Sequence, residues 1–284
     1  MKNLSLRQVA YTNFPYYKYS LKYTLDSLER IGAHDIEFYA AYPHFYLGDI
    51  TPQDIKTTAR MLKEHNLHVI NLCPENCSYP VNAISTNIHA KTRSIDHYVR
   101  ALQAANEFET PYCLFFPGWV HFDENQDEGW KRRVETMSYL AGIAETYGVQ
   151  LLLESAPRCS SILTSTEKQI KMIDEVGSRA LTGMIDLSCL FYINETVEGA
   201  VEKLGIDRIC HVHFHNCAEL TPGRYEHRLP MDGVLDLKHA LEVLDEAGYK
   251  GHFGCEVFAP YEYEPEQAML EFKKFFEQMD LLPE

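Results

Sequence analysis

Short apolar segments alternate with longer amphipathic segments eight times along this chain of 284 residues. Most of the short segments are apolar without interruption, as parallel strands buried on both faces are. The strands that we expect cover residues 6–11, 35–39, 68–72, 112–116, 149–154, 181–186, 209–214 and 252–257. The helices that we expect cover residues 20–31, 51–64, 86–108, 126–147, 165–176, 196–204, 236–247 and 264–279. The alternation therefore predicts eight strand-and-helix units.

Eight such units are what a closed parallel barrel requires, with right-handed crossovers that place the helices outside the strands. Thr51 before Pro52 is typical of a helix N-cap and first helical position, and Gly148 and Gly177 follow expected helix ends. The alternative is a doubly wound open sheet, which would carry a glycine-rich phosphate loop after the first strand, and no such loop is present. We expect a single-domain (β/α)8 TIM barrel over residues 1–284.

Composition excludes several other classes of protein. With 41 acidic against 26 basic residues and a formal charge of −15, the chain is a poor match for the phosphates of nucleic acid. The eight cysteines form no CxxC pair and mostly lie in apolar runs, which fits a reducing compartment. No segment approaches the ~18 apolar residues of a membrane span, and the first residues lack a signal-peptide core. We expect a cytoplasmic protein that contacts neither nucleic acid nor membrane.

Four potential metal ligands end four consecutive expected strands. Glu154, Asp186, His213 and Glu256 stand at the carboxyl ends of strands five to eight, where barrel enzymes carry their catalytic residues. Three carboxylates in apolar strand ends would repel one another unless a cation lay between them. The alternative is four separately satisfied residues that cap helices or pair with lysine and arginine. Because all four occur at the same height, the pattern favours a metal site.

This ligand set also indicates which ion is preferred. Three carboxylates and one imidazole form an oxygen-rich, hard site, which is better matched to Mn²⁺, Mg²⁺ or Co²⁺ than to a structural zinc held by thiolates. We expect one divalent ion, with Mn²⁺ first.

Several motifs carry a resemblance to a known superfamily. Leucines precede Glu154, an isoleucine precedes Asp186, His211-Val-His213 fills strand seven, and residues 230–236 read Pro-Met-Asp-Gly-Val-Leu-Asp. Together they resemble the xylose isomerase-like sugar isomerases and epimerases over essentially the full length. The resemblance implies that Glu154, Asp186, His213 and Glu256 are the ligands.

Within that superfamily, residues 42–44, 74–76 and 79–82 make the chain most similar to fructoselysine 3-epimerase and its relatives among the ketose 3-epimerases. Ketose 3-epimerases that act on free sugars place a histidine where this chain has Cys189, and a second glutamate where it has Ser160. Both positions contact substrate in that group. These two differences argue against a plain free-hexulose specificity, and we expect a ketose or a ketose conjugate as the substrate.

The expected chemistry is proton transfer next to a carbonyl. Glu154 and Glu256, on strands separated around the barrel, are the candidate catalytic carboxylates, one removing and one returning the proton. Return to the opposite face gives epimerisation, and return to the neighbouring carbon gives aldose–ketose isomerisation. We expect Arg228 and His215 to bind substrate, and His211 to orient a ligand. The competing interpretations are a surface arginine and packed core histidines.

Further candidates lie in the loops after strands two to six, where a small carbohydrate substrate would be enclosed. The alternative for each of these residues is a role in loop packing or on the surface. The predicted substrate contacts there are His44, Glu75, Tyr79, Trp119, Arg158 and Cys189, with His121 as a weaker candidate.

Three other functions are alternatives to an epimerase or isomerase. A lyase or deglycosidase on an oxidised sugar would use the same metal site. An endonuclease IV-like phosphodiesterase would need histidine ligands near Cys73 and Phe116, which are not present. A non-catalytic scaffold has no use for buried carboxylates. By resemblance we expect a homodimer or homotetramer.

Overall fold

The computed structural model describes residues 1–76, 81–116, 118–156, 160–218 and 226–282. Its eight strands form a closed barrel in chain order, and every neighbouring pair, including the first with the last, is parallel. The strands are β1 Val9–Thr12, β2 Asp35–Ala40, β3 His68–Pro74, β4 Tyr112–Phe115, β5 Gln150–Leu153, β6 Leu181–Asp186, β7 Ile209–His213 and β8 His252–Gly254. The predicted (β/α)8 barrel is confirmed.

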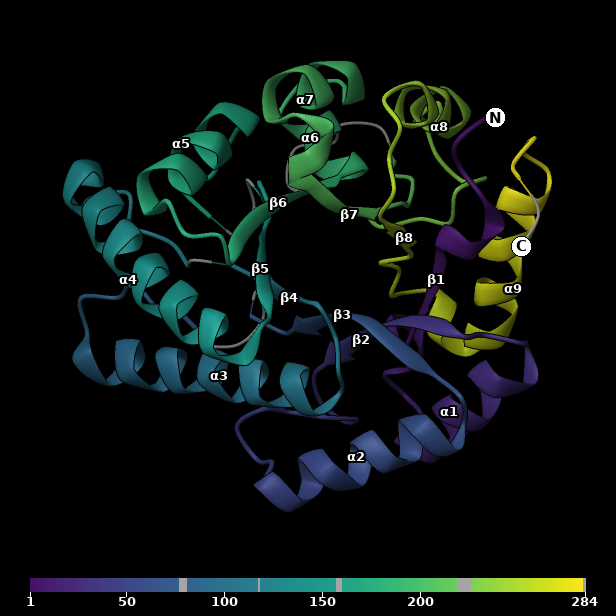
Figure 1. Ribbon diagram of the computed structural model, residues 1–284, viewed down its shortest axis with the longest axis horizontal. Helices are drawn as coiled ribbons and strands as arrows, with labels where there is room; N and C mark the ends of the chain where they lie inside the picture. Colours follow the sequence, from purple (N-terminus) through teal and green to yellow (C-terminus); the bar gives the residue numbers. More distant parts are fainter. Residues whose placement is uncertain (77–80, 117, 157–159, 219–225, 283–284) are drawn as a thin grey trace.

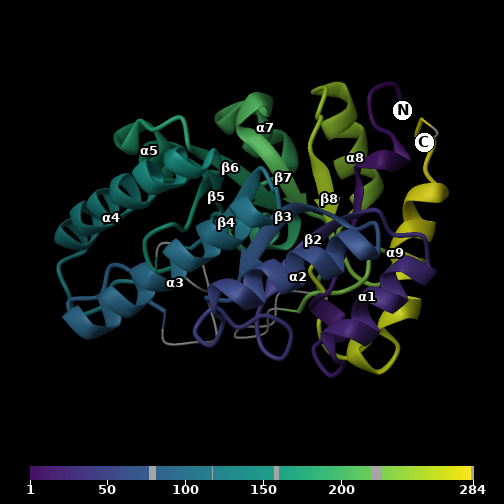
Figure 2. The same ribbon diagram turned by 60° about the horizontal axis from the view of Figure 1, so that its bottom comes forward.

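Helices surround the barrel on the outside (Figures 1 and 2). The α-helices are α1 Leu21–Arg30, α2 Pro52–Glu64, α3 Ile88–Glu107, α4 Gln126–Tyr147, α5 Thr166–Val176, α6 Leu187–Tyr192, α7 Val197–Leu204, α8 Leu237–Glu246 and α9 Pro265–Glu277. Thr51 caps α2 through the backbone N–H of Asp54, and Gly148 and Gly177 end α4 and α5 with positive φ of 68° and 63°. In the part of the chain that the structure describes, no helix has the length and apolar character to cross a membrane.

Three elements differ from the sequence prediction, and one is the eighth strand, which was predicted over residues 252–257 but ends at Gly254. Residues predicted to begin the first strand form instead the 3₁₀ helix η1 Leu6–Gln8, because Gln8 Oε1 accepts the Ser5 N–H at 2.9 Å and closes a turn. The helix α6 was not predicted, because six mostly apolar residues directly after a strand show no helical period. Its N-cap is Asp186, one of the predicted ligands.

Apolar side chains fill two layers, one between strands and helices and one inside the barrel. The inner layer includes Phe14, which follows β1, and Tyr39 on β2, and their rings stack at 4.5 Å. The edge of the Phe14 ring faces the imidazole of His213, with ring centroids 6.4 Å apart. The inner layer therefore supports the carboxyl ends of the strands, where the candidate ligands lie.

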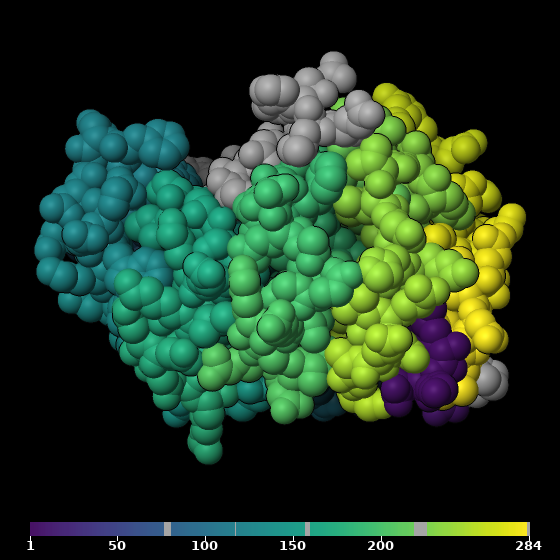
Figure 3. Space-filling view, turned by 90° about the horizontal axis from the view of Figure 1, so that it is seen from above, coloured from purple at the N-terminus to yellow at the C-terminus, as the bar shows by residue number. Residues whose placement is uncertain are grey.

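The two chain ends meet on the outside of the barrel. Ser5 and Leu282 form a parallel bridge, and the Leu282 N–H donates to Leu4 O at 2.9 Å. In Figure 3 the purple N-terminal residues accordingly lie beside the yellow C-terminal helix. Asp245 on α8 adds to this closure, since its carboxylate accepts the backbone N–H groups of residues 2–4.

Candidate metal centre

The carboxyl ends of β5 to β8 bring the four predicted ligands together. Ligand atoms of Glu154, Asp186 and His213 all lie within 4.8 Å of one another, and the three side chains are buried. The parallel register pairs Asp186 with His213 on neighbouring strands. Glu256, two residues beyond β8, places Oε2 2.9 Å from His213 Nδ1. The structure thus forms one cluster from side chains that are far apart in the sequence.

The Nδ1 atom of His213 is the centre of this cluster. Besides Glu256 Oε2 at 2.9 Å, it faces Asp186 Oδ2 at 3.6 Å, yet it makes no hydrogen bond with a described residue. A buried nitrogen with carboxylate oxygens around it and no hydrogen-bond geometry is the arrangement that ligands of one cation adopt. The residues present therefore fit a divalent metal.

Glu37 is part of this arrangement, and the sequence analysis missed it. This side chain on β2 is completely buried, with Oε1 3.0 Å from His213 Nε2 and Oε2 3.2 Å from His211 Nε2. Asn71 on β3 donates to Oε1 at 2.8 Å. Because a carboxylate only accepts, both imidazoles carry their hydrogen on Nε2, which leaves the His213 Nδ1 lone pair for a cation.

The charges of these groups depend on one another. Burial alone would raise the pKa of Glu37, but His213 and His211 outweigh it and hold that pKa well below its usual range. Burial would likewise lower the pKa of His213, but Glu37, Glu256 and Asp186 raise it well above 6.5. A proton and a cation therefore compete for Nδ1 of His213.

A glycine makes room for the Glu37–His211 pair. Gly254 ends β8, and a Cβ there would collide with Glu37 Oε2 and lie 2.8 Å from His211 Nε2. Glycine at this position is required by close packing, since no larger residue leaves the carboxylate where it is.

Asp186 has two functions in the structure. Its Oδ1 accepts the Cys189 N–H at 2.8 Å and caps α6, while its Oδ2 lies 3.6 Å from both His213 Nδ1 and His215 Nε2. Cys189, a predicted substrate contact, thus also contributes its backbone to the position of a ligand.

Two predicted substrate contacts, Arg228 and His44, have protein partners in the structure. The Arg228 guanidinium pairs with Glu226 at 2.6 Å and with Asp232 at 3.3 Å. Both ring nitrogens of His44 contact protein atoms, Asn13 Nδ2 at 3.0 Å and Tyr19 O at 3.1 Å, as a packing role would require.

The remaining predicted contacts lie after β3 to β5. Glu75 is buried and accepts the hydroxyl of Tyr39. Trp119 is half-buried and His121 is exposed. Tyr79 and Arg158 lie outside the described residues.

His215 and His227 lie beside the cluster, next to Glu256. Their rings stack with centroids 4.4 Å apart, and their ligand atoms lie within 4.8 Å of those of Glu256. His215 was predicted to bind substrate, but His227 was not singled out, because it lies in a long loop where the sequence gives no structural period.

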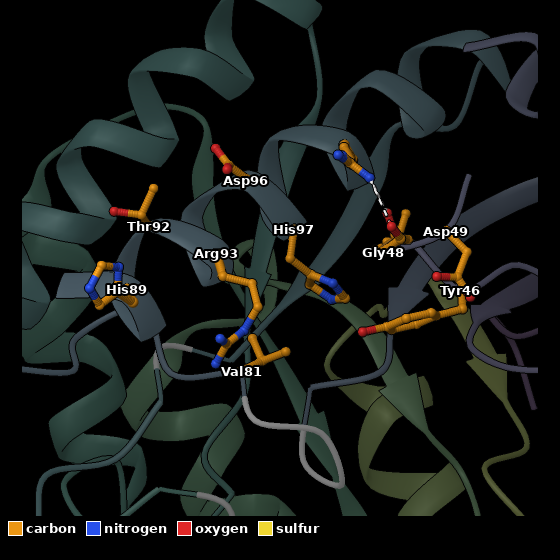
Figure 4. Close-up of a pocket in the computed structure, with 11 residues that line it drawn as sticks. Tyr46, Gly48, Asp49, Val81, His89, Thr92, Arg93, Asp96 and His97 are labelled. Carbon is orange, nitrogen blue, oxygen red and sulfur yellow. Dashed lines mark hydrogen bonds between the residues drawn. The ribbon is translucent and has the colours of Figure 1, made fainter. Parts of the chain in front are cut away.

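A separate pocket of about 500 Å³ lies between α3 and the loop that follows β2 (Figure 4). Its α3 side carries His89, Arg93, His97 and Arg100, and Arg100 donates to Gly48 O at 3.2 Å, the dashed line in the figure. The pocket shares no lining residue with the metal centre.

Comparison with known proteins identifies the family. A family model described as "Xylose isomerase-like TIM barrel" matches residues 25–279, nearly the whole chain. The chain belongs to this family. The predicted family and the prediction that the chain is an enzyme are both confirmed.

Relatives of this xylose isomerase-like barrel carry several activities. Fructoselysine 3-epimerase of Escherichia coli O157:H7 is 24% identical over 246 residues, 86% of this chain and 88% of its own. A probable endonuclease 4 of Thermoplasma volcanium is 23% identical over 175 residues, 58% of this chain and 60% of its own.

Solved structures share the fold of this xylose isomerase-like barrel. The crystal structure of IOLI protein with a binding zinc atom superposes with a TM-score of 0.78 at 20% identity, over 95% of this chain and 96% of that one. D-psicose 3-epimerase with D-tagatose, from Clostridium cellulolyticum H10, gives 0.74 at 16% identity, over 96% and 97%.

Proposed function

We propose that this barrel is a divalent-metal-dependent epimerase of the 3-epimerase type, which moves the proton on the carbon next to the carbonyl of a ketose or ketose conjugate. The observation that carries the proposal is the position of His213 Nδ1, which faces Glu256 and Asp186 without a hydrogen bond and is held there by Glu37. The similarity to fructoselysine 3-epimerase supports the choice of substrate class.

The donor set supports Mn²⁺ as the first ion to test. Glu154, Asp186 and Glu256 supply oxygen and His213 supplies one nitrogen, which suits Mn²⁺, with Mg²⁺ and Co²⁺ next. Zinc bound in a structural neighbour supports a divalent ion in this fold. The bound ion would polarise the substrate carbonyl and make the adjacent C–H more acidic.

Proton transfer is assigned to Glu154 and Glu256. They follow β5 and β8, so two strands separate them around the barrel, and a substrate between them would present opposite faces to the two carboxylates. One carboxylate removes the proton, and the other returns it to the opposite face of the same carbon, which inverts that carbon.

Apolar rings beside the cluster would position the sugar and limit access of water. Phe258 packs edge-on against Phe14 at 5.3 Å and against Tyr39 at 5.8 Å, and it lies 5.8 Å from His227. A sugar face, or an apolar group attached to the sugar, can pack on such rings. Cys189 and Ser160, which differ from the enzymes that act on free hexuloses, favour a conjugate.

The test is proton–deuterium exchange followed by NMR on a panel of ketoses and fructosamine-type conjugates. Mn²⁺-loaded enzyme should exchange the C3 proton of at least one ketose, and EDTA-treated enzyme should not. Glu154→Gln and Glu256→Gln should each abolish inversion while metal binding persists in weakened form. Exchange that produces an aldose would indicate an isomerase, and no exchange on any ketose would favour a lyase or deglycosidase.

We further propose that the enzyme works in the cytoplasm as a homodimer or homotetramer. None of the six cysteines that the structure describes is in a disulfide, which supports a reducing compartment. Light scattering after size exclusion would measure the mass, and a monomer at micromolar concentration would contradict this assembly.

A further inference from the structure

The stacked pair His215 and His227 forms, with Glu256, a second group of potential ligands beside the first. The rings are 4.4 Å apart and inclined by 25°, and ligand atoms of the three side chains lie within 4.8 Å of one another. Glu256 belongs to both groups, because its Oε2 lies 2.9 Å from His213 Nδ1 and 3.9 Å from His227 Nδ1.

The Nδ1 atoms of both histidines lack hydrogen-bond partners among the described residues. His215 is completely buried, and its other nitrogen contacts the Ser188 hydroxyl and lies 3.6 Å from Asp186 Oδ2. Because the Asp186 carboxylate can only accept, it favours the tautomer with hydrogen on Nε2, so that Nδ1 presents a lone pair. A buried nitrogen lone pair without a partner is unfavourable unless something binds it.

A direct interaction with Glu256 does not satisfy His227. The separation of 3.9 Å between Nδ1 and Oε2 is too long for a hydrogen bond but matches two ligands of one ion. Two imidazoles and one carboxylate are the protein ligands of many catalytic zinc sites, which keep a further position open.

We propose that His215, His227 and Glu256 bind a second divalent cation, with Glu256 shared between the two ions. Pairs of catalytic ions held in this way are typically about 3.5–4 Å apart. The nitrogen-rich second site favours Zn²⁺ or Co²⁺, whereas the oxygen-rich first site favours Mn²⁺. The two sites therefore differ in ion preference as well as in affinity.

The local charge supports two ions. The buried carboxylates of Glu37, Glu154 and Asp186, with that of Glu256, outnumber the charge of one divalent ion. The nearby Arg228 is engaged by Glu226 and Asp232. A second divalent ion would bring further positive charge to this buried, carboxylate-rich site.

The second site lies toward solvent. The side chains of His227 and Glu256 are 26% and 19% exposed, whereas Asp186 and His213 are essentially inaccessible. An ion there keeps free coordination positions on the open side, where it can bind a hydroxyl, carboxylate or phosphate oxygen of the substrate away from the reacting carbon. This inference goes beyond the proposed epimerisation, which requires one ion only.

The experiment counts bound Co²⁺ on the purified full chain after removal of metals with a chelator. Equilibrium dialysis followed by elemental analysis should give two Co²⁺ per chain for the wild type. His215→Ala and His227→Ala should each give one, and binding of the remaining ion also shows that the variants are folded. Glu256→Gln should weaken both ions, as a shared ligand must.

The control is His239→Ala, which removes an exposed histidine paired with Glu198 on α7 and should leave two ions bound. One Co²⁺ per chain in saturated wild type would overturn the proposal, as would two in both His215→Ala and His227→Ala. The measurement of bound Co²⁺ uses no sugar. A count of one ion would overturn the second site and leave the proposed epimerase untouched, whereas absence of proton exchange would overturn the epimerase and leave the second site untouched.

Discussion

Glu37→Gln is the substitution that most directly tests how this site is built. The change keeps the shape of the side chain but removes its charge and replaces one acceptor oxygen with an NH₂ donor. In the wild type the two oxygens face His213 Nε2 at 3.0 Å and His211 Nε2 at 3.2 Å, and both are acceptors. In the variant one imidazole N–H must face the new NH₂, so that ring turns or changes its tautomer.

The expected change in Mn²⁺ affinity follows from the lost orientation of His213. Groups that orient a metal-bound histidine typically change metal affinity by about 10–100-fold, or about 1.4–2.7 kcal/mol. Because Glu37 accepts the hydrogen bond from His213 Nε2 and so fixes this ring, we expect the upper half of that range. Isothermal titration of chelator-treated protein with Mn²⁺ measures the dissociation constant directly.

A matched control lies on the same strand. Asp35 begins β2, and three histidines surround it, His34 at 2.9 Å, His68 at 3.1 Å and His252 at 3.5 Å, two residues before Glu37. Asp35→Asn makes the same chemical change at the opposite end of the strands, so Mn²⁺ affinity should stay at the wild-type value. If Glu37→Gln also binds Mn²⁺ as tightly as the wild type while its thermal unfolding is cooperative, the role assigned to Glu37 is refuted.

Three further predictions concern packing and stability. Gly254→Ala should displace Glu37 and weaken Mn²⁺ binding as Glu37→Gln does, whereas Gly142→Ala, in open space on α4, should leave the titration unchanged. Saturating Mn²⁺ at 100 times its dissociation constant should add about 2.7 kcal/mol and raise the melting temperature by roughly 5–10 °C, and a chelator should reverse the shift in calorimetry. Asp245→Asn should cost about 1–3 kcal/mol in urea unfolding, because the carboxylate accepts three backbone N–H groups. Burial raises the pKa of Asp245, but these N–H donors lower it overall. The stability that Asp245 contributes is therefore complete above the unfolded pKa of about 3.9 and is lost as the pH falls through the lower folded pKa. A variant that loses equal stability at pH 7 and pH 2.5 would contradict this prediction.

The sequence predicted those features that depend on local periodicity. Eight apolar segments alternate with amphipathic ones, so the number of strands, the helices other than α6, and the carboxyl-end position of Glu154 and Asp186 could be inferred. The same approach failed at residues 6–8, where Gln8 closes a 3₁₀ turn on Ser5, and at α6, whose six residues are too few to show a period.

Features that depend on contacts between distant strands could not be predicted in this way. Glu37 pairs with His211 and His213 across more than 170 residues of sequence, and an antiparallel bridge between Asn216 and Arg228 brings His227 against His215. A sequence signal for Glu37 existed, since a lone carboxylate between Ile36 and Phe38 in a buried strand needs a buried partner. Which residue is that partner depends on the closed barrel, which brings β7 close to β2.

The double use of Asp186 links the metal centre to the backbone of α6. One oxygen holds the first turn of that helix through the Cys189 N–H, and the other faces the ligand cluster. A cation that fixes the carboxylate also fixes the cap, so local opening of this short helix becomes coupled to occupancy of the site. The amide of Cys189 is therefore a built-in reporter: its hydrogen exchange should slow when the ion binds, without any probe attached to the protein.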